Sequence, residues 1–310
     1  MAVAYQRDRI YKLTVGDYKS GKGIEITDLQ IRFDCNKSAD NKKKSNSSAV
    51  EVYNLSQRSL QLLQSDFISC TLEVGYKDTG LVMLLKGNVT SLNTTKQGND
   101  TITRIQIGEG YVDLNHVKLK MTIPPGKTQK EIVKELTKQM PGISEGAFAW
   151  ANMDSPIPFG YPLHGSPADM MDELGEAWRL EWRVSNGKME VSDENGLVSK
   201  NKNEAPVISA ASGLIDIPFY TSGESTKTKK DTTRRVGLQF KALLNPDLVP
   251  GKLVRIESFS TAVVSKNASG EVKPIQGWYR IHSAKYTGDF RGNDWYVECF
   301  CTIVLEDDFK

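Results

Sequence analysis

The residues of this chain that could do chemistry are few and lie far apart. The three histidines, His116, His164 and His282, belong to no recognisable catalytic motif in the sequence. A lone histidine more often lies at the surface or is hydrogen-bonded within a core than serves in catalysis. The zinc-protease motif H-E-x-x-H and the dinucleotide-binding pattern G-x-G-x-x-G are absent. We therefore expect no catalytic residue, no cofactor and no enzymatic activity.

One stretch approaches a phosphate-binding loop without completing it. Gly16 to Gly23 reads G-D-Y-K-S-G-K-G, but the last position holds glycine where such loops need a hydroxyl for the metal ion. No helical pattern follows it, so a plain turn is the expected structure.

The four cysteines are expected to be buried free thiols. Cys299 and Cys301 lie two residues apart in a strand-like run, so their side chains would face the same side. A metal site would need a second closely spaced pair, and Cys35 and Cys70 each stand alone. The spacing predicts no metal site.

Two clusters of basic residues could contact phosphate or a protein partner. Clustered cations bind phosphate without sequence preference, but neither cluster has the interleaved aromatic residues that stack on bases. Solvated loops are the ordinary reading, and loops that become ordered only against another subunit are the alternative. The candidate contact residues are Lys42, Lys43, Lys44, Lys229, Lys230, Arg234 and Arg235.

Composition limits the function classes further. The 310 residues are 39% hydrophobic, which suffices for two or three domains. With 40 Lys and Arg against 38 Asp and Glu, the net charge of +2 gives no broad field that would attract nucleic acid or an anionic membrane. The sequence shows no export signal and no apolar run long enough for a membrane anchor. We expect a protein that is made in a cytoplasm and stays there until it meets a partner.

The first third of the chain has the pattern of β structure. Leu29 to Phe33 alternates apolar with polar residues, as does Val50 to Tyr53. The polar run from Asn36 to Ser48 between them is expected to form a long exposed loop. Ser56 is a suitable N-cap for one short helix. Residues 1–118 are predicted to form a first β-barrel or sandwich domain.

The middle of the chain changes to mixed α and β structure. Thr128 with Glu131 forms a capping box for one helix, and Ser166 caps a second one. Asn186-Gly187 between two alternating runs predicts a tight β-hairpin. The connection Thr122 to Pro125 is expected to be irregular. Residues 119–205 are predicted to form a small helix-plus-hairpin domain.

The last third returns to β structure. Its strands are expected to begin with Leu214 to Pro218 and to end with Trp295 to Leu305. Residues 206–310 are predicted to form a second β domain. The fold class is therefore mainly β, with an α+β insert flanked by two β domains.

Several short segments, taken together, resemble baseplate hub proteins of contractile-tailed bacteriophages. They follow the family's order and cover most of the chain, although Glu109 stands where the family has aspartate. The Lys-rich loop and residues 221–235 are poorly matched, so the resemblance assigns no contact roles there. The segments are V-E-V-Y-N-L-S from Val50, L-E-V-G-Y from Leu72, L-K-G-N-V-T from Leu85, I-Q-I-G-E-G-Y from Ile105, G-L-I from Gly213, L-L-N-P from Leu243, Y-R-I from Tyr279, T-G-D from Thr287 and D-W from Asp294.

The resemblance implies a fold and a function. Such hubs carry two β-barrels like those of the tail tube, with an α/β domain between them. Three chains form a ring, a homotrimer, whose six barrels imitate a ring of the tube. One face meets the hexameric tail tube and the other meets the trimeric central spike, among further baseplate proteins. The protein would be assembled in the host cytoplasm and would lie in the virion tail, and DNA would pass through its lumen during ejection. Apart from the resemblance, the two basic clusters stay candidates for contacts with the tube or with another subunit.

Three other functions stay open from the sequence. An equivalent hub or spike part of a type VI secretion system or a phage-tail-like bacteriocin would do the same physical task. A tail-associated cell-wall hydrolase would need a pair of carboxylates at a suitable separation. A carbohydrate-binding protein could use tryptophans as platforms, although tryptophans more often fill cores. These tryptophans are Trp150, Trp178, Trp182, Trp278 and Trp295.

Overall fold

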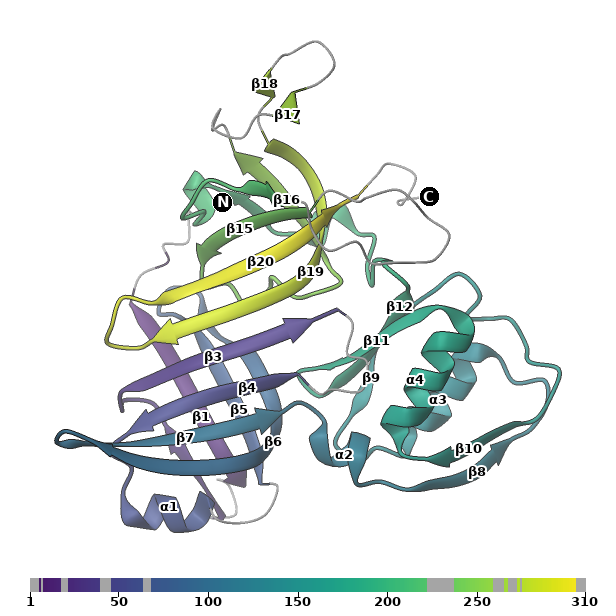
Figure 1. The fold of residues 1–310 in the computed structure, drawn as a ribbon, viewed down its shortest axis with the longest axis horizontal. Coiled ribbons are helices and arrows are strands. Elements are labelled where there is room, and N and C mark those ends of the chain that lie inside the picture. Colours follow the sequence, from purple (N-terminus) through teal and green to yellow (C-terminus); the bar gives the residue numbers. More distant parts are fainter. Residues whose placement is uncertain are drawn as a thin grey trace.

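The computed structural model describes residues 6, 8–17, 22–39, 46–63, 68–221, 237–258, 265–266, 272–273 and 275–304. The expected fold class is confirmed, because a mainly β chain carries an α+β insert in its middle (Figure 1). We call Arg9–Gly108 the first β module, Tyr111–Asp193 the insert and Val207–Ile303 the second β module. The domain boundaries at 118/119 and 205/206 stay a prediction.

The first β module contains seven strands of one large sheet and a short helix. The helix begins where expected, since the Ser59 backbone N–H donates to Ser56 Oγ at 3.1 Å. The elements are β1 Arg9–Asp17, β2 Lys22–Ile26, β3 Ile31–Ser38, β4 Ser47–Tyr53, α1 Gln57–Leu63, β5 Ser69–Tyr76, β6 Gly80–Gln97 and β7 Asp100–Gly108.

The insert combines three helices with two small sheets. Both predicted caps are confirmed: Thr128 and Glu131 form the capping box of α3, and Ser166 accepts from the Asp169 N–H at the start of α4. Asn186 and Gly187 both have positive φ, as the predicted tight hairpin turn requires. The elements are α2 Tyr111–Asn115, β8 Leu119–Ile123, α3 Gln129–Lys138, β9 Ser144–Ala149, β10 Tyr161–Gly165, α4 Pro167–Trp178, β11 Leu180–Ser185 and β12 Lys188–Asp193.

The second β module contributes the remaining strands of the large sheet. Its strand β19 is long enough to pair with β16 along its first part and with β3 along its second part. Figure 1 shows β19 curving between these two neighbours. A short helix, η1 Lys202–Glu204, precedes the module. The elements of the module are β13 Val207–Ser209, η2 Ala210–Ser212, β14 Phe219–Thr221, β15 Gly237–Leu243, β16 Leu253–Ser258, β17 Ser265–Lys266, β18 Val272–Lys273, β19 Ile275–Asp289 and β20 Trp295–Ile303.

The two β modules have the same strand order. The first runs β3-β4-β7-β6-β5-β1 across the sheet, and the second runs β14-β15-β20-β19-β16-β13. Neighbouring strands are antiparallel in both, except that β13 lies parallel to β16 where β1 lies antiparallel to β5. Each module also has a register shift in its longest strand, at Thr90 in β6 and at His282 in β19. The chain therefore repeats one β topology on both sides of the insert.

The two modules join edge to edge. Strand β3 pairs with the second half of β19, from Ser283 opposite Ser38 to Asp289 opposite Arg32. This pairing merges both modules into a 13-stranded sheet, visible in Figure 1 as β20 and β19 lying beside β3, β4 and β7. One cluster of buried apolar side chains underlies both modules. The insert has a second cluster of its own, built around Leu136, Leu174 and Val191.

The structure corrects three local expectations. The run Asn36 to Ser48 is not wholly an exposed loop, because β3 continues to Ser38, β4 starts at Ser47, and Lys37 and Ala39 are buried. Thr122 and Ile123 belong to strand β8, which pairs with β10. Leu214 to Pro218 forms no strand, since Leu214 makes only an isolated bridge to Ala242. Each error concerns pairing with distant residues, which local periodicity does not report.

Candidate functional site

Among the described residues, the polar groups with the most partners lie where the parts of the chain meet. We call the pairing of β3 with β19 the seam. Across it, Arg32 Nε lies 2.8 Å from Asp289 Oδ2, and Lys285 Nζ lies 3.3 Å from Asp34 Oδ2. The Lys285–Asp34 pair is exposed and contributes little, because water and salt screen it, whereas Asp289 is largely buried beneath Arg32. Both pairs add charge complementarity to the backbone hydrogen bonds of the seam.

Asp289 anchors the end of the seam. Its carboxylate accepts hydrogen bonds from Gln30, Arg32 and the Gly292 backbone N–H, at 2.5 to 2.8 Å. Burial acts to raise the pKa of Asp289, but these hydrogen bonds outweigh it and hold the pKa below its usual value. Arg9 donates to the carbonyls of Asp289 and Gly292 as well. The turn after β19 is thus fixed to the first β module.

A groove of about 430 Å³ lies over the seam and is lined by residues of both modules. It is lined by side chains of both signs, including Arg32, Asp34, Glu51, Arg104 and Asp289. Arg104 and Glu51 pair at 2.6 Å, so the positive groups in the groove are largely matched by nearby carboxylates. A surface neutralised in this way offers no strong attraction to a phosphate backbone.

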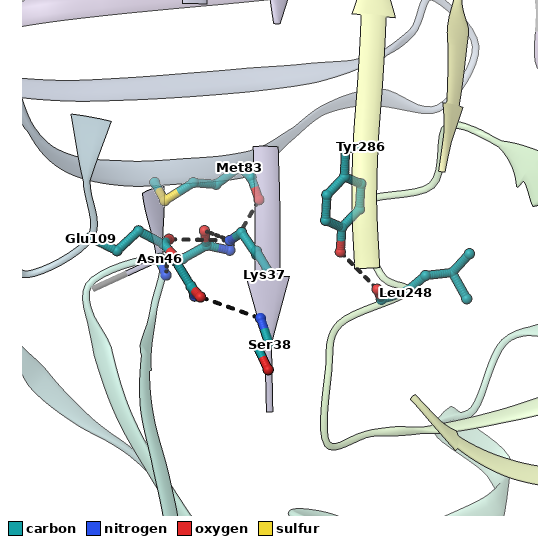
Figure 2. Close-up of polar contacts among 8 residues, drawn as sticks. Lys37, Ser38, Asn46, Met83, Glu109, Leu248 and Tyr286 are labelled. Carbon is teal, nitrogen blue, oxygen red and sulfur yellow. Dashed lines mark hydrogen bonds and ion pairs between the residues drawn. The ribbon is translucent and has the colours of Figure 1, made fainter. Parts of the chain in front are cut away.

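A buried polar cluster joins the insert to the first β module. Glu109 is fully buried, and its Oε1 lies 3.1 Å from Lys37 Nζ and accepts the Asn186 backbone N–H at 2.9 Å. Its Oε2 accepts from Asn46 Nδ2 at 3.0 Å. Asn186 further accepts from Lys37 Nζ at 2.8 Å and donates to the Met83 carbonyl. Figure 2 shows Glu109, Lys37 and Asn46 converging at the end of β3.

This cluster, which we call the Glu109 cluster, fixes the tip of the β11–β12 hairpin. Asn186 sits at the turn with φ of 53°, where its side chain reaches the first β module. Removing one partner of a buried ion pair leaves an uncompensated charge, which costs much more than the intact pair contributes. The hairpin tip therefore has one strongly preferred position on the module.

A second buried cluster joins the insert to the second β module. Glu181 of β11 forms a short ion pair with Arg280 of β19, and the two side chains are 4% and 1% exposed. Arg280 Nε also donates to the Gly196 carbonyl at 2.7 Å. Next to it, buried Arg183 pairs with Glu190 at 2.6 Å and lies against Gly251, where a Cβ would come within 2.5 Å of the guanidinium. We call these contacts the Arg280 cluster.

No family model matches the sequence, and no curated protein matches it. Among solved structures, a tail protein from Neisseria meningitidis superimposes with a TM-score of 0.61 at 10% identity, covering 96% of this chain and 97% of that one. A prophage tail protein from Shewanella oneidensis gives 0.60 at 10% identity, covering 97% and 99%.

The chain has a tail-protein fold. A third structure with the same fold is an Escherichia coli component of the type VI secretion system, described as structurally similar to two tail proteins of bacteriophage T4. It superimposes with a TM-score of 0.58 at 9% identity, covering 90% of this chain and 74% of that one. At identities of 9–10%, these similarities show the fold alone and assign no role to individual residues.

The structure does not describe the basic residues that the sequence singles out as contact candidates. All of them lie outside the described residues: Lys42, Lys43, Lys44, Lys229, Lys230, Arg234 and Arg235. Their role as contact residues stays a prediction.

The four cysteines are buried and free. Burial raises the pKa of Cys35 to about 12 and raises the pKa of the other three thiols as well. Such thiols are poor nucleophiles and poor metal ligands. Within the described part of the chain, no group of three His, Cys, Asp or Glu side chains could hold a metal ion. No described helix is long and apolar enough to cross a membrane.

Two motif-like stretches have plain structural explanations. Gly16 and Gly23 face each other across the β1–β2 hairpin, so the loop-like sequence lies between two strands. Gly142 to Gly146 reads G-I-S-E-G, which matches the serine-hydrolase motif G-x-S-x-G. That motif needs a strained turn from strand to helix, whereas Ser144 begins strand β9 and donates to the Gly187 carbonyl at 3.3 Å.

Most of the tryptophans belong to the cores rather than to an exposed platform. Trp150, Trp182 and Trp295 are at most 4% exposed. Trp178 and Trp278 are half-buried, and Trp178 packs against the ring of Tyr161. Three of the five side chains thus cannot present a flat face to a sugar.

Proposed function

We propose that this chain is a structural hub of a phage tail baseplate, in which three copies form a ring between the hexameric tail tube and the trimeric spike. The observation that carries the proposal is the repeated β topology, with the two copies joined edge to edge. A ring of three such chains would present six similar modules. A closed ring can thereby meet sixfold symmetry on one face and threefold symmetry on the other.

The rigid connections support this mechanical role. The Glu109 and Arg280 clusters attach the insert to both modules through buried charged groups. An adapter that transmits force between tube and spike must keep its modules in register, and buried polar clusters specify one arrangement more strictly than apolar contacts do. The balanced charges along the seam suit a surface past which DNA moves during ejection.

The proposal makes a prediction about partners. When the chain is produced together with the tail-tube and spike proteins encoded beside it, we expect it to copurify with both and to cap one end of the tube in electron micrographs. If neither protein is retained and the purified chain instead degrades peptidoglycan, with turnover abolished by a carboxylate substitution, the structural role would be refuted in favour of a cell-wall hydrolase.

A second candidate is the equivalent part of a type VI secretion system or a phage-tail-like bacteriocin. The similarity to the Escherichia coli secretion component favours this candidate. The physical task would be the same, and the neighbouring genes distinguish them, because capsid and terminase genes accompany a phage.

A further inference from the structure

The long strands β6 and β19 occupy equivalent places in their modules but have different numbers of neighbours. The first part of β19 pairs with β16, and its second part, Ser283 to Asp289, pairs with β3 across the seam. The first part of β6 pairs with β5 in the same way. Its second part, residues 91–97, pairs only with β7 on one side and has no second strand beside it among the described residues.

Strand β14 shows the complementary difference. It corresponds to β3 in the repeated strand order, but β3 has β19 on its outer side, whereas β14 pairs only with β15 in the described part of the chain. Phe219 of β14 is 51% exposed, and the preceding Ile215 and Ile217 are exposed as well. An uncovered strand edge with exposed apolar side chains is an aggregation hazard that proteins normally cover.

We propose that residues 91–97 of β6 in one copy pair with β14 of the next copy, repeating the seam between chains. The inference rests on the proposed function, because it supplies the contact by which the ring closes. Each copy would offer one edge of each kind, so the contact is head-to-tail and closes into a ring if the rotation per copy allows it.

The internal seam predicts the register of the new one. Tyr220 connects through Leu238 and Cys301 to Ile281, the residue before the register shift in β19. Cys35 connects in the same way through Ser48 and Ile107 to Val89, the residue before the register shift in β6. Tyr220 is therefore the equivalent of Cys35.

Cys35 lies opposite Tyr286, which is the fifth residue after Ile281. The fifth residue after Val89 is Thr94. Tyr220 of one copy should thus lie opposite Thr94 of the next. The neighbouring pairs are then Thr221 with Asn93 and Phe219 with Thr95.

The side chains fit this register. The internal seam places the large Tyr286 opposite the small Cys35, and the predicted seam places the small Thr94 opposite the large Tyr220, so the summed size is similar. The pair of Phe219 and Thr95 brings an aromatic ring against a β-branched residue, a favourable cross-strand combination. Asn93, Thr94 and Thr95 are exposed in the single chain.

The strand count agrees with a hollow ring. From one proposed edge to the other, each chain contributes β14, β15, β20, β19, β3, β4, β7 and β6 in sequence across the sheet. Three copies would close a barrel of about 24 strands, more than the 16 to 18 strands that already leave a water-filled channel in porins. Such a barrel has a lumen and no free edge.

Disulfide crosslinking tests the register directly. Residues opposite each other in antiparallel strands have Cα atoms about 4.5–5.5 Å apart, which suits a disulfide. We expect the variant Asn93→Cys with Thr221→Cys to give covalent trimers on oxidation, at least about tenfold more than the pair Asn93→Cys with Phe159→Cys. Phe159 is 76% exposed and lies between β9 and β10 of the insert, so it belongs to neither of the two proposed edges. The native thiols are buried and should not interfere.

A matched internal control uses the equivalent positions of the existing seam. Asn36 lies opposite Lys285, so Asn36→Cys with Lys285→Cys should form a disulfide within one chain and leave its mass unchanged. If the first pair impairs folding, Thr95→Cys with Phe219→Cys reports the same register. The inference fails if a mass measurement shows trimers but neither cysteine pair crosslinks them. That result would leave the hub function intact. The inference also fails if neither trimer nor crosslink appears at any concentration or with tail tube present, and loss of tube binding as well would refute the hub function.

Discussion

Replacing Glu109 with alanine is expected to lower the free energy of unfolding by about 3–5 kcal/mol, the usual cost of removing one partner from a buried ion pair. The substitution leaves Lys37 charged and buried and removes the acceptor of the Asn46 amide and the Asn186 N–H. Chemical denaturation measures the change. Hydrogen exchange should show the largest loss of protection at the β11–β12 hairpin tip.

Two comparisons isolate the Glu109 cluster as the cause. Glu51→Ala removes a carboxylate from an exposed pair with Arg104 in the same module and should cost less than about 1 kcal/mol. The double variant Lys37→Ala with Glu109→Ala should recover part of the loss, because neither charge is then left alone. If Glu109→Ala lowered the free energy of unfolding no more than Glu51→Ala does, the Glu109 cluster would not fix the hairpin to the first β module.

Replacing Arg280 with alanine is expected to have an effect of similar size, about 3–5 kcal/mol, on the other side of the insert. Glu181 would be left buried without its cation, and the Gly196 carbonyl would lose its donor. The loss of hydrogen-exchange protection should centre on β11 and on residues 195–198, and the Glu109 side should keep its protection. Denaturation and exchange together distinguish a local release from global unfolding.

Lys285→Ala provides the matched control for Arg280→Ala, because Lys285 lies on the same strand and pairs with Asp34 at a 47% exposed position. It should cost less than about 1 kcal/mol. If both substitutions cost the same, the Arg280 cluster would not fix the insert to the second β module.

Much of the local structure could be predicted from the sequence, because its causes are local. The caps at Thr128 and Ser166 and the turn at Asn186 depend on residues within one turn of the chain, and all three are confirmed. The alternation Ile31, Phe33 and Cys35 on the buried face of β3 is equally local.

The seam could not be predicted in this way, because β3 and β19 are separated by most of the chain. The repeated topology was expected only through the family resemblance and not from the local pattern, since equivalent positions hold unlike residues, such as Cys35 and Tyr220. The same limit applies to the functional clusters. Lys37 lies in a run that reads as a solvated loop, and its burial depends on Glu109, which is distant in sequence.

One signal for the Glu109 cluster was nevertheless present. Glu109 directly follows strand β7, which ends at Gly108, and precedes Gly110, which adopts positive φ against Ile143 and Val184. A carboxylate between a buried strand and a tight turn has to find a partner in the interior. The sequence does not reveal which cation supplies it.

The most direct test of the central claim is the number of chains in the assembled ring, measured by native mass spectrometry on the complex with the tail tube and compared with class averages of the same particles. Our interpretation predicts three chains per ring and an outline with six similar lobes. A ring of six chains, a single chain at the end of the tube, or a trimer held together only through its inserts would contradict it.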